Sequence, residues 1–473
     1  MFSKINKKSL IIILISIIGI LLRLLFYSYH RYFWTDEAAL ALNIININNY
    51  FIPLQWGQAA PTLFMYISKI MYNLFLQKEL ALRFFPLLFS IGSIFAFNKL
   101  ARKFCNGFFS QVLAISVFSF SYPLVYYAQE FKQYSLDTLI FILILLSYDY
   151  LKILNNGKKK LILSVLYSLA LFTSYPAFFA IFVVFLNLLL FNIRQFKKCF
   201  YMLVPILLTG FLYVILFHSQ ITDNGLHSYW QSGFLTINLK HDVNLITSFF
   251  EYIFSAKLII IFFFATIFMC IKEKLFDEKY CLLYISVLLA IGLSLLKVYP
   301  LQSRVSLYLI PVIIILTAKS ADFVSLKNKA IEKLLLTLCC IIFLFPMCNY
   351  TNNMVIKKQV WLEDFVTPLN LALSKAEKND IIIISDGSKW LYEYYKNFYK
   401  INYQVIVEPA FTDENKYIDY LNKYKKGEKY YIIYAHNRNK LKRLSTIYNW
   451  AKTKDDFGFV FDKSMNAMIQ FYF

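Results

Sequence analysis

The chain has 473 residues, of which 59% are hydrophobic and 16% are charged. Soluble globular domains are about 45–50% apolar and about 25% charged, so this composition excludes a soluble globular protein. The mean hydropathy is +0.53, and long apolar runs predict several membrane crossings. The net charge is +21, but Lys and Arg cluster between the apolar runs, which is typical of cytoplasmic loops rather than of a nucleic-acid surface.

The first apolar run, over residues 10–27, follows Lys4, Lys7 and Lys8, and no small-residue cleavage site comes after it. We therefore predict a span that runs from the cytoplasm outward, rather than a cleaved signal peptide. The next apolar run, 61–76, is short, and a span there would move the later basic clusters to the outer side. We predict that it lies on the membrane surface as an amphipathic helix.

The later apolar runs alternate with basic clusters and are long enough to cross a hydrocarbon core of about 30 Å. They lie at about 82–100, 108–126 and 134–151, on both sides of Tyr175-Pro176, and onward to about 334–347. Keeping each basic cluster in the cytoplasm predicts about 11 transmembrane helices, with a cytoplasmic N-terminus and an outer C-terminal region.

Long apolar runs stop at about residue 349. Beyond that point, strand patterns at 380–386, 430–434 and 467–473 alternate with helical patterns at 389–398 and 440–450, which predicts a small α/β domain. The predicted fold class is therefore mainly α. A polytopic membrane domain over 1–348, with a large first outer loop at 28–80, is followed by an extracytoplasmic α/β domain over 349–473.

Asp36 and Glu37 stand just outside the membrane after the first span. Charges beside hydrocarbon are costly, so two adjacent carboxylates at this place need a reason. A structural reason is that Thr35 or Asp36 caps a helix beginning at Glu37. A catalytic reason is favoured by Arg23 within the first span and by the polar and aromatic segment at 55–58.

A second outer loop, between the third and fourth predicted spans, contains Glu130, Lys132 and Tyr134. A solvated loop is the structural alternative for this segment. Asp137 lies just inside the fourth span, and an acid at membrane depth indicates function by default.

A third outer loop contains Gln302 and Arg304. Arg304 is either a snorkelling interface residue or a phosphate ligand, because a guanidinium offers a fork of donors to phosphate oxygens. Three outer loops thus place carboxylates, amides and cations at one membrane face. This set suits a transferase with a lipid-phosphate donor, in which a carboxylate takes the acceptor proton and cations stabilise the leaving phosphate.

Other kinds of chemistry lack their motifs in the sequence. It has neither a Walker A loop nor a Gly-rich dinucleotide fingerprint, and its five His have no metal-ligand spacing. A soluble nucleotide-handling enzyme is therefore disfavoured.

In these segments the chain resembles the GT-C glycosyltransferases, specifically the polyprenyl-phosphate-sugar-dependent family 39 type, which includes protein O-mannosyltransferases and lipid A aminoarabinose transferases. The resemblance runs in order along most of the chain. The matching segments are 34–37, 60–66, 79–86 with Arg83, 128–134, Gln302 with Arg304, and the C-terminal α/β region.

The resemblance implies that Asp36 is the general base, assisted by Glu37. Together with the arguments from membrane depth and charge above, it predicts that the following residues bind substrate: Arg83, Glu130, Lys132, Tyr134, Asp137, Gln302 and Arg304. It also implies a polyprenyl-phosphate sugar donor, inversion at the anomeric carbon, and neither a cofactor nor an obligatory metal. Many members have His or Lys where this chain has Ala59 and Ala60, so Lys132 or Arg304 is expected to make that phosphate contact.

The resulting prediction is a glycosyltransferase of the bacterial inner (plasma) membrane. It transfers a hexosyl or pentosyl group to a lipid, glycan or protein acceptor on the outer face, and its partners include membrane lipids but no nucleic acid. Two alternatives remain open. A transporter or flippase of lipid-linked sugars typically shows internal repeats around a midplane site, and none is evident here. The other alternative is a non-catalytic assembly protein that binds partners through its α/β domain.

Overall fold

The computed structural model describes residues 7–218, 224–324, 328–353, 363–399, 401, 403–410, 414–424, 428–435, 441–461 and 467–472. Its contacts divide the chain into two compact units. The membrane unit comprises residues 1–29, 49–54 and 59–357, and the α/β unit comprises residues 30–48, 55–58 and 358–473. Residues 30–48 therefore group by contacts with the C-terminal region, while the domain boundary predicted at residue 349 stays a prediction.

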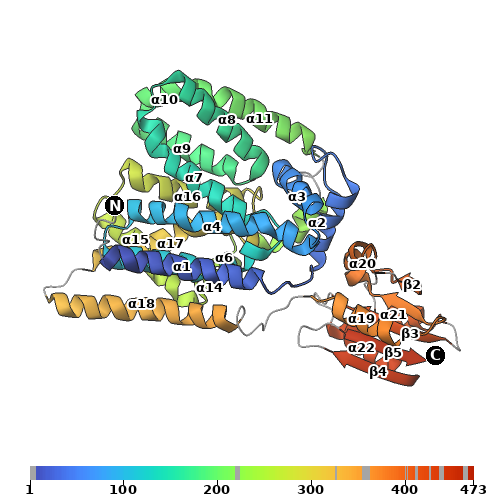
Figure 1. Cartoon of the computed structure of the whole chain (residues 1–473). Helices are drawn as coiled ribbons and strands as arrows, with labels where there is room; N and C mark the ends of the chain where they lie inside the picture. The colour runs from blue at the N-terminus through green and yellow to red at the C-terminus, as the bar shows by residue number, and fades with distance from the viewer. Residues whose placement is uncertain are drawn as a thin grey trace. The chain divides into compact units, whose positions relative to one another are not determined.

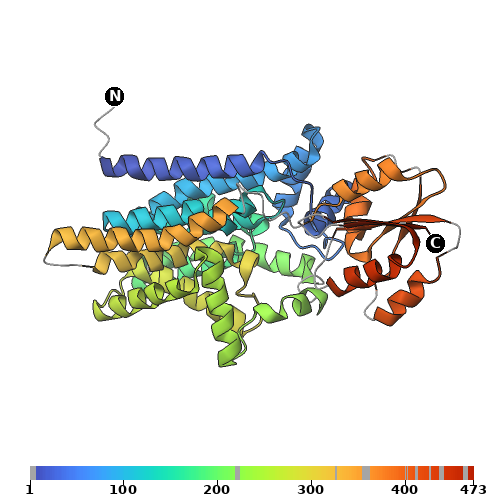
Figure 2. The same ribbon diagram turned by 90° about the horizontal axis from the view of Figure 1, so that it is seen from below.

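In its described residues the membrane unit consists of helices joined by short connections (Figures 1 and 2). Its α-helices are α1 (Lys7–Tyr27), α3 (Thr62–Leu74), α4 (Lys78–Phe104), α5 (Phe108–Phe120), α6 (Tyr122–Tyr126), α7 (Tyr134–Ile153), α8 (Gly157–Thr173), α9 (Ala177–Phe191), α10 (Ile193–Cys199), α11 (Leu203–Leu216), α13 (Asn224–Tyr229), α14 (Leu239–Phe254), α15 (Ile260–Lys272), α16 (Glu278–Leu295), α17 (Ile310–Ala318) and α18 (Lys329–Thr351). The 3-10 helices that matter for the site are η1 (Tyr127–Gln129), η3 (Gln231–Gly233) and η5 (Ser303–Leu309).

Within the described ranges, five helical segments are long and apolar enough to cross a membrane. They are α1, α4, α16, the α10–α11 segment and the segment Ser303–Phe323. A sixth is formed if α5 and the helical segment Tyr122–Gln129, bent by 49°, count as one span. Each predicted span falls on a helix, although several are short or broken, and the chain is a multi-pass membrane protein. The predicted surface run forms α3, which packs against α4 and α8 and is not among the candidate spans.

Arg23 joins three helices of the membrane unit. Its guanidinium, which is fully buried, donates to Ser90 Oγ on α4 at 2.8 Å and to the carbonyl of Ser119 on α5 at 2.8 Å. It also donates to the Gly19 carbonyl of its own helix at 2.9 Å. A Cβ on Gly19 would lie 2.7 Å from Ser119 Cβ, so α1 and α5 need glycine at their closest approach. These contacts indicate that Arg23 has a structural role, linking α1, α4 and α5 by hydrogen bonds inside the unit.

The α/β unit contains a five-stranded sheet with the strand order β2-β1-β3-β5-β4. Its strands are β1 (Ile381–Ile384), β2 (Gln404–Val407), β3 (Lys429–Tyr434), β4 (Asp455–Phe461) and β5 (Ala467–Tyr472). Strands β2, β1 and β3 are parallel, and β5 and β4 complete the sheet as an antiparallel pair. Its α-helices are α2 (Thr35–Asn46), α19 (Val366–Lys375), α20 (Lys389–Tyr395), α21 (Glu414–Leu421) and α22 (Leu441–Ala451).

Figure 2 shows this sheet nearly edge-on, with helices on both faces. One face, which includes Ile383 and Ile432, packs against Leu421 of α21 and Ile447 of α22. On the other face the Tyr431 hydroxyl donates to the Lys375 carbonyl at the end of α19. Strands β1 and β3 are buried along almost their whole length, as expected for parallel strands covered on both faces, and the sheet with its helices confirms the predicted small α/β domain. Lys440 and Phe473, which bound two of the predicted elements, lie outside the described residues.

Candidate functional site

The acidic pair occupies the first turn of α2, which begins at Thr35. The residue before the helix is Trp34, whose side chain makes no capping hydrogen bond. Acidic residues in the first turn favour the helix because they face its positive end. The positive end of the helix therefore offsets the cost of two adjacent carboxylates, and Asp36 need not act as a cap.

Two side chains from the C-terminal part of the α/β unit hold the backbone that leads into this turn. Glu363 Oε2 accepts a hydrogen bond from the Thr35 amide at 2.7 Å, and the Tyr395 hydroxyl accepts one from the Phe33 amide at 2.8 Å. Helix α20 also packs along α2. The helix that carries the acidic pair is thus fixed by residues more than 300 positions away in the sequence.

The two carboxylates differ in their surroundings. Glu37 is fully buried, and its Oε2 lies 3.6 Å from a guanidinium nitrogen of Arg31, which is itself buried. Asp36 is partly exposed. A buried ion pair holds its members in place, whereas a general base must be reached by the substrate hydroxyl. This difference favours Asp36 as the base and Glu37 as a positioning residue.

The membrane unit brings together the other two predicted loops at one end of its helices. Tyr127 lies within electrostatic range of both Glu130 and Arg304. The Glu130 side chain is fully buried, and the Lys132 amide donates to the Glu130 carbonyl at 2.7 Å. Arg304 lies over the ring of Trp230, with its guanidinium carbon 5.5 Å from the centroid. The glutamate loop and the late arginine therefore share one end of the unit.

The remaining predicted residues lie around this region. Tyr134 is buried, with its ring centroid 5.2 Å from that of Tyr127. Asp137 is buried within electrostatic range of Tyr299 and Tyr308. Arg83 is buried on α4 and acts electrostatically on Tyr27, at the end of α1.

Two further contacts within the membrane unit involve α6, directly before η1. The end of α1 packs against α6, with the ring centroids of Phe26 and Tyr126 6.0 Å apart. At the end of α18, the Thr351 hydroxyl donates to the Phe120 carbonyl at 2.7 Å, and the Tyr350 ring contacts that of Tyr122. The convergence of Asp36 with Glu130 and Arg304 in one pocket stays a prediction.

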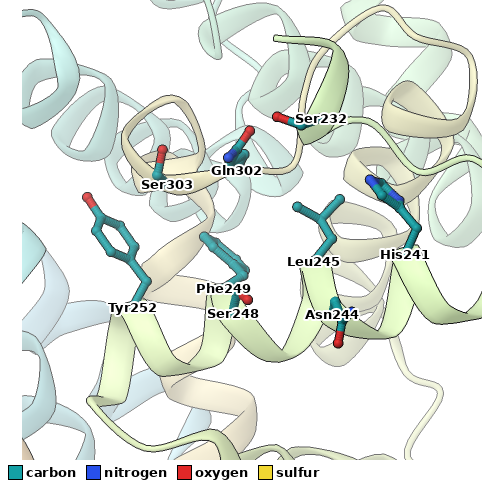
Figure 3. Close-up of a pocket in the computed structure, with 9 residues that line it drawn as sticks. All are labelled: Ser232, His241, Asn244, Leu245, Ser248, Phe249, Tyr252, Gln302 and Ser303. Atoms are coloured by element: carbon teal, nitrogen blue, oxygen red, sulfur yellow. The ribbon is translucent and has the colours of Figure 1, made fainter. Parts of the chain in front are cut away.

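A cavity of about 420 Å³ opens beside the late loop (Figure 3). One wall is a face of α14 with residues at helical spacing, and the other is the loop that contains Gln302 and Ser303. In Figure 3 the side chains of Phe249 and Tyr252 extend from α14 toward the loop that contains Gln302 and Ser303. The lining residues are Ser232, His241, Asn244, Leu245, Ser248, Phe249, Tyr252, Gln302 and Ser303.

Close packing fixes Gln302 in that wall. A Cβ on Gly233 would lie 2.5 Å from Gln302 Oε1, and the Leu301 amide donates to the Gly233 carbonyl at 2.8 Å. Glycine at position 233 therefore lets η3 approach the loop directly before Arg304.

Sequence reasoning missed several residues at this site. Arg31, Glu363 and Tyr395 contact or brace the acidic pair's helix, and His241 and Tyr252 line the cavity. Arg31 was detectable as the nearest cation to the pair, and the 3–4-residue spacing along α14 was detectable as an amphipathic pattern. Nothing local marks Glu363 or Tyr395, because only tertiary contacts bring them to α2.

Within the described ranges, no group of three His, Cys, Asp or Glu side chains gathers as a metal site would require. The absence of an obligatory metal or cofactor stays a prediction from the resemblance.

No family model matches the chain, and no curated protein matches its sequence. Its structure is similar to the crystal structure of ArnT from Cupriavidus metallidurans bound to undecaprenyl phosphate, with a TM-score of 0.57 and 10% identity over 97% of both chains. The apo ArnT structure gives a TM-score of 0.52 and 11% identity over 96% of this chain and 97% of that one.

The archaeal oligosaccharyltransferase AglB from Archaeoglobus fulgidus, in complex with an inhibitory peptide and a dolichol-phosphate, is also similar. Its TM-score is 0.54, with 11% identity over 98% of this chain and 74% of AglB. The chain has the GT-C fold. Identities this low show the fold alone, so the activity has to be argued from the site. The narrower family 39 resemblance stays a prediction.

Proposed function

We propose that this chain is an inverting glycosyltransferase that transfers a sugar from a polyprenyl phosphate to a lipid, glycan or protein acceptor. The observation that carries the proposal is the acidic pair at the start of α2. Asp36 is partly exposed there, while its neighbour Glu37 is held by Arg31. A GT-C fold with such a fixed and accessible carboxylate suits removal of a proton from an acceptor hydroxyl.

In the proposed reaction the acceptor oxygen attacks the anomeric carbon of the donor sugar. A new carbon–oxygen bond forms on the face opposite the phosphate, and the bond between the anomeric carbon and the phosphate oxygen breaks. The acceptor proton passes to the Asp36 carboxylate, and polyprenyl phosphate leaves with the bonding electrons. Negative charge therefore moves from the carboxylate to the leaving phosphate, where cations stabilise it.

The cavity between α14 and the late loop is the proposed place for the donor headgroup. Its volume of about 420 Å³ lies within the range of small-ligand pockets, and Gln302, Tyr252 and His241 offer it hydrogen-bonding groups. Arg304 follows the loop residues that line it and supplies a guanidinium for phosphate. The similar structures of ArnT and AglB hold undecaprenyl phosphate and a dolichol-phosphate, which supports a lipid phosphate as the leaving group.

The reaction is proposed for the extracytoplasmic face of a bacterial inner membrane. Basic clusters at 102–103, 158–160 and 197–198 lie at the helix ends opposite the site loops. The positive-inside rule assigns those ends to the cytoplasm. The site and the α/β unit are then exposed on the outer side.

The direct test replaces Asp36 with Asn in purified enzyme reconstituted into liposomes with polyprenyl-phosphate sugars. Release of polyprenyl phosphate measures turnover, and mass spectrometry of surface glycans from wild-type and deletion strains identifies the sugar and acceptor. Asp36→Asn is expected to lower kcat by about 10²–10⁴-fold. Asp149→Asn is the matched control, because Asp149 lies near the opposite end of α7 and pairs with Lys103 at 2.8 Å. Full turnover by Asp36→Asn would exclude it as the base.

A further inference from the structure

The parallel part of the α/β sheet contains a point where the strand order reverses. From β1 the chain continues to β2 on one side, whereas from β3 it continues to β4 and β5 on the other side. In open α/β sheets, ligands bind outside the carboxyl ends of the two strands that flank such a switch point. In this unit that location is the edge formed by Ser385 after β1 and Ala435 after β3.

Polar contacts fix the backbone at this edge. Ser385 Oγ and Ser388 Oγ lie 2.9 Å apart, and the Ala435 amide donates to Ser388 Oγ at 3.0 Å. The start of α2 reaches the same turn, because the Thr35 hydroxyl donates to the Gly387 carbonyl at 3.4 Å. Asp36 and the switch-point edge are therefore neighbours within one compact unit.

Two tryptophans flank this edge. Trp390 is the second residue of α20, which begins directly after the β1 turn, and its ring centroid lies 6.2 Å from that of Trp56 in a T-shaped arrangement. Both side chains are partly exposed. Lys389 Nζ lies 5.0 Å from the Trp390 ring centroid, and the partly exposed Asp386 belongs to the turn itself.

The backbone at Trp56 is strained. Trp56 has a φ of +57° and Gly57 a φ of +64°, and a left-handed conformation is unfavourable for a bulky aromatic residue. The buried side chain of Asn43 on α2 imposes it, accepting from the Gln55 amide at 2.8 Å and donating to the Gln55 carbonyl at 3.2 Å. A Cβ on Gly57 would have nothing within 4 Å, so this turn borders open space. Strain that surrounding contacts maintain is concentrated at functional sites.

We infer that the β1/β3 edge, with Trp56, Trp390 and Asp386, is a carbohydrate-binding site that presents a sugar-bearing acceptor to Asp36. Indole rings offer apolar surface to the C–H faces of a sugar ring, and a carboxylate and an ammonium group bind its hydroxyls. Simple core packing would bury both rings and would not need a strained turn. The role of the bound sugar as an acceptor rests on the proposed function, whereas sugar binding itself does not depend on transfer.

The test uses the full chain in detergent micelles with a panel of methyl glycosides and short oligosaccharides as probes. Saturation-transfer NMR and tryptophan fluorescence report binding. At least one probe is expected to bind saturably to the wild type. Trp390→Ala and Trp56→Ala should each weaken its Kd by about tenfold or more, as expected for loss of an aromatic anchor. Trp390→Phe and Trp56→Phe keep a ring and should retain part of the affinity.

Trp450→Ala is the matched control from the opposite edge of the same sheet. Trp450 is also partly exposed, and its Nε1 donates to Asn422 at 2.9 Å near the amino end of β3. This variant should bind the probe as the wild type does. Thermal unfolding identifies any Ala variant that fails to fold. In that case the affinities of the Phe variants for the probe test the site instead.

Binding of no glycoside, equal binding by all the Trp variants, or binding of a peptide library instead would overturn the inference. Asp36→Asn separates the two proposals, because it should abolish transfer and leave glycoside binding intact. If no transfer is found but the glycoside binds through Trp56 and Trp390, the site stands and the transferase assignment falls.

Discussion

The two units of this protein use buried arginines in different ways. In the membrane unit, the Arg23 guanidinium is satisfied by a serine hydroxyl and by backbone carbonyls, all of them uncharged. In the α/β unit, the Arg31 guanidinium faces the Glu37 carboxylate at 3.6 Å. The first arrangement fastens helices together, whereas the second fixes a carboxylate next to the one proposed to react. Burial of an arginine therefore does not by itself identify a functional site.

The units also hold different halves of the proposed chemistry. The carboxylates belong to the α/β unit, and the candidate phosphate ligands belong to the membrane unit. Variants in the α/β unit should therefore impair proton removal, and variants in the membrane unit should impair phosphate stabilisation or donor binding, which makes the comparison testable.

The largest expected effect is on stability, from Arg31→Met. This change leaves the Glu37 carboxylate buried without its cation, and breaking a buried pair costs about 3–5 kcal/mol. Unfolding of the detergent-solubilised protein would measure it, and the double variant Arg31→Met/Glu37→Gln should recover much of the loss. The control is Lys257→Met, which removes a 3.3 Å ion pair with Glu251 in which both side chains are exposed, and it should cost about 0–1 kcal/mol. If the arginine variant and the lysine variant lose equal free energy of unfolding, the assigned role of Arg31 is contradicted.

The next effect is on the chemical step, from Arg304→Ala. Removing one group that stabilises developing charge lowers kcat by about 10²–10³-fold in well-studied enzymes. Arg304→Lys keeps the charge but loses the planar fork, so it should recover only part of the rate. Unchanged turnover by Arg304→Ala would assign the arginine a structural role, through its contacts with Trp230 and the Tyr229 hydroxyl.

A smaller effect is expected from Glu363→Gln. The carboxylate accepts from the Thr35 amide at the start of α2, and loss of such a contact costs about 1 kcal/mol. Because α2 carries Asp36, kcat should fall several-fold while the KM for the donor stays constant. Asp364→Asn on the adjacent residue, whose carboxylate accepts from the Thr367 amide, is the control. If Glu363→Gln changes only the donor KM, Glu363 does not position Asp36.

The smallest effect concerns pH and the cavity wall. Hydrogen bonds from His241 and from the Thr236 amide hold the pKa of Asp242 below its ordinary value, and the same carboxylate also fixes the Ile237 amide. A lowered pKa means that this support is present above about pH 4 and is lost as the pH falls through the folded-state pKa. Titration of Asp242 should therefore not change the donor KM of the wild type between about pH 5 and 8. Asp242→Asn should raise the donor KM about two- to threefold. A wild-type KM that Asp242→Asn leaves unchanged would contradict the link.

Much of the fold was predictable because its signals are local. Apolar runs bounded by basic clusters determined the spans, and strand patterns such as 381–384 determined the α/β sheet. The distribution of charge along later loops predicted that the run at 61–76 does not span, and α3 is not among the candidate spans. Strands β2 and β4 were not predicted, because β-strand preference depends strongly on packing against neighbouring strands and helices.

The candidate site was only partly predictable. Adjacent charges beside a span made Asp36 and Glu37 conspicuous, but their different roles depend on Arg31, Glu363 and Tyr395. The same holds for the Trp56–Trp390 pair, whose members are far apart in the sequence.

The sequence by itself determined that the chain crosses a membrane several times and that a small α/β domain follows. Hydrophobic periodicity and charge near hydrocarbon are properties of neighbouring residues, so the linear chain records them. Only the tertiary structure decided that α2 belongs with the C-terminal unit, that Glu37 is paired, and that the sheet's switch point adjoins the acidic pair. These features depend on contacts between residues hundreds of positions apart, for which no local pattern is required.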